Sequence, residues 1–180
     1  LTTSCIAVAL LFGIGGASAF NLAMGHGDEE EAVHYMGNAA ISMFGCGVCL
    51  CLICQIFLDP LVYFFGAPEN IAGYAKTYIR ITSIGFPFLI MSSGGGHLIR
   101  ADGSPKMSMI CNLIGAIINT ILDAMFVFGL HMGMAGAALA TIIGQFISGG
   151  IAIRYLCHCK TVTLKRSHLK PHKKYISRIM

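Results

Sequence analysis

Hydrophobic residues occur in five long runs separated by short polar breaks. The runs cover about residues 1–24, 38–57, 77–99, 107–130 and 134–156. A helix of about 20 apolar residues, rising about 1.5 Å per residue, crosses a hydrocarbon core of about 30 Å. A membrane barrel would show short alternating segments instead of continuous runs. The pattern therefore predicts an all-α membrane protein, a polytopic bundle of five transmembrane helices over residues 1–156.

The composition supports a membrane-embedded chain. Of its 180 residues, 56% are hydrophobic and 11% are charged, whereas a water-soluble domain has about 25% charged residues. The formal net charge is +4, and the segment 157–180 contains basic residues but no acid. By the positive-inside rule we expect this segment to be a basic cytoplasmic tail of a protein in the cell membrane. Its charge suits the lipid bilayer as a partner rather than nucleic acid.

One acid, Asp123, lies within an apolar run. The other seven acids lie in or beside polar breaks: Asp28, Glu29, Glu30, Glu31, Asp59, Glu69 and Asp102. An ionisable group at membrane depth costs about 2.5–3.5 kcal/mol on insertion scales and marks a functional site by default. Asp123 is therefore the leading candidate functional residue. Its alternative role is that of a hydrogen-bonded acid that holds two helices together.

Polar side chains accompany Asp123 along one helical face, on which Asn112 and Asn119 also lie. The next run begins after the short connection 131–133, so it must form an antiparallel neighbour. Counting equal distances from this connection places Thr141 level with Asp123 and Gln145 level with Asn119. Such oxygen-bearing side chains suit a hard monovalent cation or a proton rather than a soft metal.

The run 77–99 is irregular in its middle. Pro87 follows Gly85 and Phe86, and it removes a backbone hydrogen bond, so a kink is expected there. The polar break after this run contains Ser104, a suitable N-cap, followed by Pro105, which is favoured at the first position of a helix. Bends of this kind suit a transporter helix that moves, but a fixed kink is an equally good interpretation.

The eight cysteines do not indicate a disulfide framework or a metal site. Six of them lie in apolar runs, where cysteine behaves as a small hydrophobe. The pairs Cys46/Cys49 and Cys51/Cys54 have the spacing of zinc ligands, but four thiolates on one continuous helix cannot converge on a tetrahedral ion. We therefore expect no metal and no cofactor.

The start of the chain suggests a piece of a longer protein. The first residue is Leu1, and apolar sequence begins almost at once. With five spans, a cytoplasmic tail would place Leu1 outside the cell, which is unusual unless a helix precedes it. The sequence is therefore expected to be a fragment.

Three stretches resemble the multidrug and toxic compound extrusion (MATE) family. They are Arg100–Lys106, with the sequence RADGSPK; Ile114–Asp123, with IGAIINTILD; and Gly133–Gln145, with GMAGAALATIIGQ. The stretches Gly13–Ser18 and Gly25–Ala32 resemble the second helix of that family and the loop after it. The resemblance covers essentially the whole chain.

The resemblance implies a transporter of two six-helix lobes that exports organic cations or drugs in exchange for Na⁺ or H⁺. The chain would supply five helices of the first lobe and, at 157–180, the start of the interlobe linker. The first helix and the second lobe would be missing partners from the same parent chain. The cation site of the family matches Asn119, Asp123 and Thr141 here, with Asn112 and Gln145 as supporting polar residues.

Three other functions fit parts of the pattern. A lipid-linked saccharide flippase has a related helical plan. A basic central cavity would favour this function, but these spans have little cationic lining. A non-transporting membrane accessory subunit would be favoured if the gene ends near Met180. A membrane-embedded metalloenzyme would need acids and histidines at ligand spacing within the spans, and none is evident.

Overall fold

The structure is a computed structural model that describes residues 1–64, 69–161 and 173–179. The chain in these ranges is predominantly helical, which confirms the predicted all-α class. The elements in chain order are α1 (Thr2–Gly25), α2 (Glu29–Ile56), α3 (Leu58–Phe64), α4 (Glu69–Ser83), α5 (Phe86–Ala101), α6 (Pro105–Ala124), the π-helix η1 (Met125–Gly129), α7 (Gly133–Leu156) and α8 (Lys173–Ile179).

The number of long helices differs from the expected five. Four helical segments in the described part of the chain are long and apolar enough to cross a membrane: Thr2–Gly25, Glu29–Ile56, Pro105–Gly129 and Gly133–Leu156. The predicted span 77–99 is instead divided between α4 and α5, which have 15 and 16 residues.

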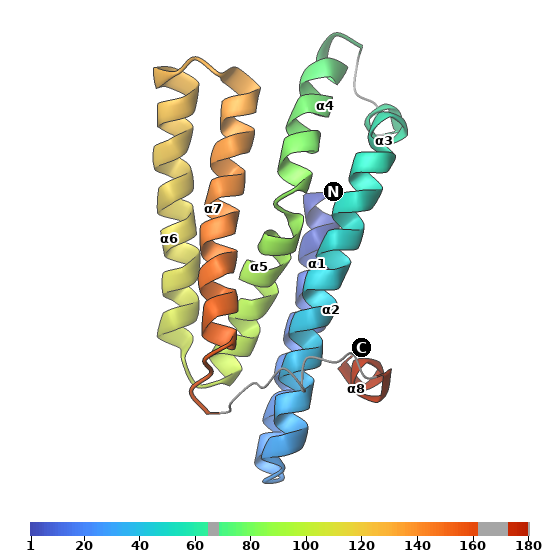
Figure 1. Cartoon of the computed structure of the whole chain (residues 1–180), viewed down its shortest axis with the longest axis vertical. Coiled ribbons are helices and arrows are strands. Elements are labelled where there is room, and N and C mark those ends of the chain that lie inside the picture. Colours follow the sequence, from blue (N-terminus) through green and yellow to red (C-terminus); the bar gives the residue numbers. More distant parts are fainter. Residues whose placement is uncertain (65–68, 162–172, 180) are drawn as a thin grey trace.

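The division of that span has a local cause at Pro87. Because proline has no backbone N–H, the carbonyl of Ser83 loses its usual helical donor. The chain turns at Ile84 and Gly85, where the Gly85 N–H donates to the Thr82 carbonyl at 3.0 Å. The kink expected from sequence is therefore a break, and α4 and α5 follow one another along the bundle (Figure 1).

Helix α2 begins before the apolar run that predicted it. The run starts near residue 38, but the helix starts at Glu29, with Asp28 as its N-cap. The Asp28 side chain accepts a hydrogen bond from the Glu31 N–H at 2.9 Å. Three glutamates in the first turn also interact favourably with the positive end of the helix dipole. Much of the predicted polar break 25–32 is thus helical.

Helix α5 lies at the centre of the bundle. Figure 1 shows α1 and α2 on one side of it and the α6–α7 hairpin on the other. Glycines let the helices approach closely: a Cβ on Gly94 of α5 would lie 2.7 Å from the Ala9 carbonyl oxygen of α1. The main hydrophobic core fills the α1–α2–α5 side and includes the fully buried Phe20, Met36 and Ile90.

A buried acid joins three segments at one end of the bundle. Asp102, in the loop between α5 and α6, is 0% exposed. Its Oδ2 accepts hydrogen bonds from the Tyr155 hydroxyl and the Lys160 N–H, both at 2.8 Å. Its Oδ1 accepts from the Thr161 N–H at 3.1 Å and also contacts the Thr161 hydroxyl. Its position in a polar break between two apolar runs did not predict that this loop residue is buried.

The same end of the bundle carries the turn between α1 and α2 and the C-terminal end of α7 (Figure 1). Helix α8 packs beside α1 and α2, with Arg178 Nη1 3.1 Å from Glu31 Oε1. Part of the predicted basic tail is therefore placed next to the acidic start of α2. Residues 162–172 and 180 of that tail lie outside the described part of the chain.

Candidate functional site

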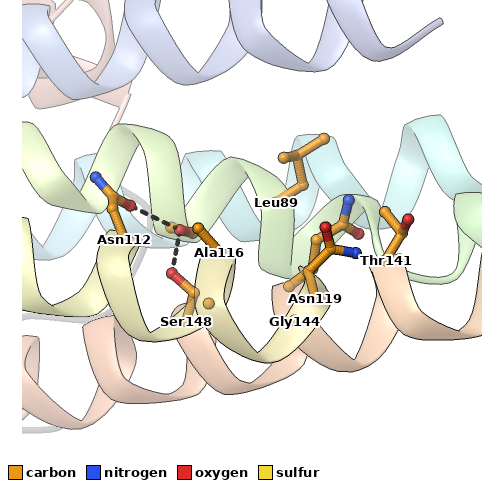
Figure 2. Close-up of a pocket in the computed structure, with 10 residues that line it drawn as sticks. Leu89, Asn112, Ala116, Asn119, Thr141, Gly144 and Ser148 are labelled. Atoms are coloured by element: carbon orange, nitrogen blue, oxygen red, sulfur yellow. Dashed lines mark hydrogen bonds between the residues drawn. The ribbon is translucent and has the colours of Figure 1, made fainter. Parts of the chain in front are cut away.

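Helices α5, α6 and α7 line an open cavity of about 210 Å³ (Figure 2). Its lining is polar on α6 and α7 and includes four of the five side chains proposed from sequence: Asn112, Asn119, Thr141 and Gln145. The sequence-based expectation that these two neighbouring helices bring their polar faces together therefore agrees with the position of the cavity. The full lining consists of Leu89, Ser92, Asn112, Gly115, Ala116, Asn119, Thr141, Gly144, Gln145 and Ser148.

The close approach of α6 and α7 depends on glycines. A Cβ on Gly115 would lie 2.7 Å from the Ser148 Cβ, and a Cβ on Gly144 would lie 3.0 Å from the Asn119 Cβ. Asn119 is therefore beside Gly144, the residue next to Gln145. This contact agrees with the depth matching that paired Asn119 with Gln145, and the antiparallel course of the helices then places Asp123 near the level of Thr141.

Asp123 does not line the cavity itself. It lies one turn beyond Asn119, in the last turn of α6. Its Oδ1 is buried without a hydrogen-bond partner among the described residues. The Asn119 Nδ2 and Gln145 Oε1 atoms are also buried and unpartnered. Buried polar atoms are normally hydrogen-bonded, so a group of three unpaired ones indicates a place where a ligand or another polar group completes the contacts.

The hydroxyl of Thr141 is hydrogen-bonded within its own helix. It donates its hydrogen to the Ala137 carbonyl of its own helix, with an Oγ1–O distance of 2.9 Å. Because that bond uses the hydrogen, the oxygen lone pairs remain available on the cavity side. Carboxylate, amide and hydroxyl oxygens together can bind a hard cation.

A π-helix begins two residues after the candidate acid. Residues Met125–Gly129 form η1, and the Leu130 N–H donates to the Met125 carbonyl, five residues earlier, at 3.0 Å. Single π turns are rare and often occur at functional sites. The apolar sequence MFVFG contains no proline or polar residue that would have revealed this feature.

Two serines extend the polar lining toward the end of the bundle that carries Asp102. The Ser92 hydroxyl of α5 contacts both Asn112 and Ser148, and Figure 2 draws these contacts as dashed lines at the two labelled residues. It donates to the Asn112 Oδ1 at 3.2 Å, and its oxygen is 2.5 Å from the Ser148 Oγ. Neither serine was predicted as a site residue, because a lone serine in an apolar run is usually satisfied by its own helix.

Comparison with known proteins identifies a family and relatives that the chain resembles. The model of the MatE family matches residues 1–125. The chain is 32% identical, over 171 residues, to the multidrug export protein MepA of Staphylococcus haemolyticus; the match covers 94% of this chain and 38% of that protein.

Solved structures show the same fold. A MATE crystal structure in the bent conformation superposes with a TM-score of 0.90 at 23% identity, covering 98% of this chain and 40% of that one. An outward-facing multidrug resistance MATE transporter of the MOP superfamily gives a TM-score of 0.88 at 24% identity, covering 97% and 39%.

The chain thus spans about two fifths of the length of the proteins it matches. The match to the family model extends over more than half of the chain and includes Asn119 and Asp123. The chain belongs to the MatE family, whose members are membrane transporters and not enzymes.

Proposed function

We propose that this chain is part of a cation-coupled antiporter that exports organic cations or drugs across the cell membrane. Asn119, Asp123 and Thr141 bind the coupling ion, Na⁺ or H⁺, with Asn112 and Gln145 as supporting polar residues. The observation that carries the proposal is the unpartnered, buried Asp123 Oδ1, one helical turn from a polar cavity between α5, α6 and α7. Binding a cation there would satisfy an oxygen that the described residues leave unpaired.

Cation binding must favour one conformation to drive transport. A ligand shifts an equilibrium only by the difference between its affinities for the two states. The candidate site is suited to this because it is divided between α6 and α7, so a change in their spacing changes the set of oxygens a cation meets. The break between α4 and α5 adds a bending point nearby, since the Gln145 side chain lies directly against Gly85.

The lining favours a cationic ligand over an anionic one. None of the ten residues around the cavity is lysine or arginine. A flippase for a phosphate-linked saccharide would need positive charge near its substrate. Neutral oxygens beside a carboxylate instead support cation binding.

The proposed topology places the end of the bundle that carries Asp102 in the cytoplasm. Among the described residues, Arg100, Lys106, Arg154 and Lys160 lie at or near this end. The positive-inside rule assigns such an end to the cytoplasmic side. A further helix and a second lobe of the same parent protein complete the transporter, which accords with the 38% coverage of the MepA relative.

The direct test uses the full-length transporter that contains this chain. Ethidium efflux is measured from cells under imposed Na⁺ and H⁺ gradients, for the wild type and for Asp123→Asn at equal expression. Loss of gradient-driven efflux in the variant supports the proposal. Normal gradient-driven efflux in Asp123→Asn would contradict it and leave Asp123 with a packing role.

A further inference from the structure

Ser92, Asn112 and Ser148 form an oxygen cluster at the inner end of the cavity, here called the inner cluster. Its three side chains come from three different helices, α5, α6 and α7. The Ser92 Oγ lies 3.2 Å from the Asn112 Oδ1 and 2.5 Å from the Ser148 Oγ. Ser148 is only 4% exposed, so its hydroxyl is held at the interface between helices.

The inner cluster and the residues near Asp123 line one continuous cavity. Asn112 lies seven residues before Asn119 on α6, about 10 Å along the helix axis toward the proposed cytoplasmic end. Asn112 is exposed, whereas Ser148 is buried. The cluster therefore has an accessible side, and it lies on the proposed cytoplasmic side of the candidate site.

We propose that the inner cluster is a second, cytoplasmic-side resting site for the coupling ion and that this ion is Na⁺. The inference rests on the proposed function and names the ion that function left open. All three ligands of the cluster are neutral oxygens, which bind a hard metal cation but provide no site that accepts a proton near neutral pH. The Asp123 carboxylate alone can hold a proton, whereas a sodium ion needs several oxygen ligands around it.

The serine oxygens of the inner cluster can become available to a cation without any change in the helices. Its internal hydrogen bonds use hydroxyl hydrogens that rotate freely, and a serine in a helix can turn its hydrogen toward the carbonyl four residues earlier. The threonines of the same hairpin already show this arrangement: Thr120 donates to Ala116 and Thr141 to Ala137, both at 2.9 Å. After that rotation the serine lone pairs would face an incoming cation.

The test measures ethidium efflux from membrane vesicles containing the full-length transporter, as a function of Na⁺ at fixed pH with choline as the replacement cation. The variants are Ser92→Ala and Ser148→Ala. Losing one ligand oxygen is expected to raise the Na⁺ concentration for half-maximal efflux about three- to tenfold.

Thr120→Ala is the matched control, because it removes a hydroxyl from an exposed position of α6 outside the cavity lining. It is expected to leave the Na⁺ response unchanged. If an alanine variant does not reach the membrane, Ser92→Cys or Ser148→Cys keeps the side-chain size and replaces the hard oxygen with a poor sodium ligand.

If variants at Ser92 and at Ser148 both have the wild-type Na⁺ concentration for half-maximal efflux, the inference is overturned. Efflux that follows the pH gradient with no dependence on Na⁺ would also overturn it. Either result leaves the proposed function intact as long as Asp123→Asn abolishes gradient-driven efflux. Normal efflux in Asp123→Asn, by contrast, contradicts the proposed function itself.

Discussion

Helix α6 has an inward-facing acid near each end, and the two acids differ in their surroundings. Asp102, just before the helix, accepts hydrogen bonds from Tyr155, Lys160 and Thr161. Asp123, in its last turn, has a buried Oδ1 without a partner in the described part of the chain. A carboxylate whose oxygens are all occupied stabilises the fold, whereas one with an unpaired oxygen is available to a ligand. The comparison therefore separates a structural acid from a candidate functional one.

The largest expected effect concerns the thiol beside Asp102. Burial, followed by the negative charges of Asp102 and Cys157, raises the pKa of Cys159 to about 12 from a usual value of 9.0. At pH 8 the thiolate fraction should thus be about a thousandfold lower than for an ordinary thiol. Maleimide labelling followed by mass spectrometry should modify the exposed Cys157 long before Cys159. Equal labelling rates would show that the region around Asp102 is open to water.

Asp102→Ala should give the largest loss of stability. The substitution leaves the Tyr155 hydroxyl and two backbone N–H groups without their acceptor. Breaking such a buried set costs about 2–4 kcal/mol, measurable as a fall in the melting temperature of the purified protein. Asp102→Asn retains one acceptor oxygen and should lose less. A melting temperature unchanged in both variants would show that Asp102 does not hold these segments together.

Tyr155→Phe isolates one hydrogen bond of the same set. The phenol donates to Asp102 Oδ2 at 2.8 Å, while Asp102 keeps its other donors. The expected loss is about 0.5–1.5 kcal/mol, the usual net value of one hydrogen bond. Measured in the Asp102→Ala background, Tyr155→Phe should have almost no further effect. An equal loss in both backgrounds would place the role of the hydroxyl elsewhere.

Asp123→Asn should have the smallest effect on stability. The substitution keeps the side-chain shape and removes no hydrogen bond that Oδ1 makes within the described residues. In the absence of a bound cation, the change in unfolding free energy should be below about 0.5 kcal/mol. Thermal melting in a buffer without Na⁺ tests this. A loss as large as that of Asp102→Ala would assign Asp123 a structural role instead.

Much of the α6–α7 arrangement could be predicted because the connection is so short. The residues 131–133 force the two helices to be antiparallel, so residues equally far from the turn lie at equal depth. The cavity lined by Asn119, Thr141 and Gln145 is consistent with this count. The position of Asp123 outside the lining depends on side-chain direction, which counting along a helix does not determine.

Other features required information that the hydrophobic pattern lacks. The inner cluster combines residues of three helices, and only their packing brings Ser92 to Ser148. The break at Gly85 was expected only as a kink, because a proline reveals the missing donor but not how far the chain turns. The early start of α2 was predictable in principle, since Asp28 and Glu31 have the spacing of a capping box.

The most direct test of the account is the cation dependence of thermal stability in the full-length transporter. A ligand that binds only the folded state raises the melting temperature as its concentration rises. Na⁺ is titrated at fixed pH, and pH is varied without Na⁺, for the wild type, Asp123→Asn and Asp102→Asn. The account predicts that the coupling ion raises the melting temperature of the wild type and that Asp123→Asn loses this response. Asp102→Asn should keep the response, although its melting temperature without the ion is lower. An Asp123→Asn protein that responds like the wild type would contradict the central claim that Asp123 binds the coupling cation.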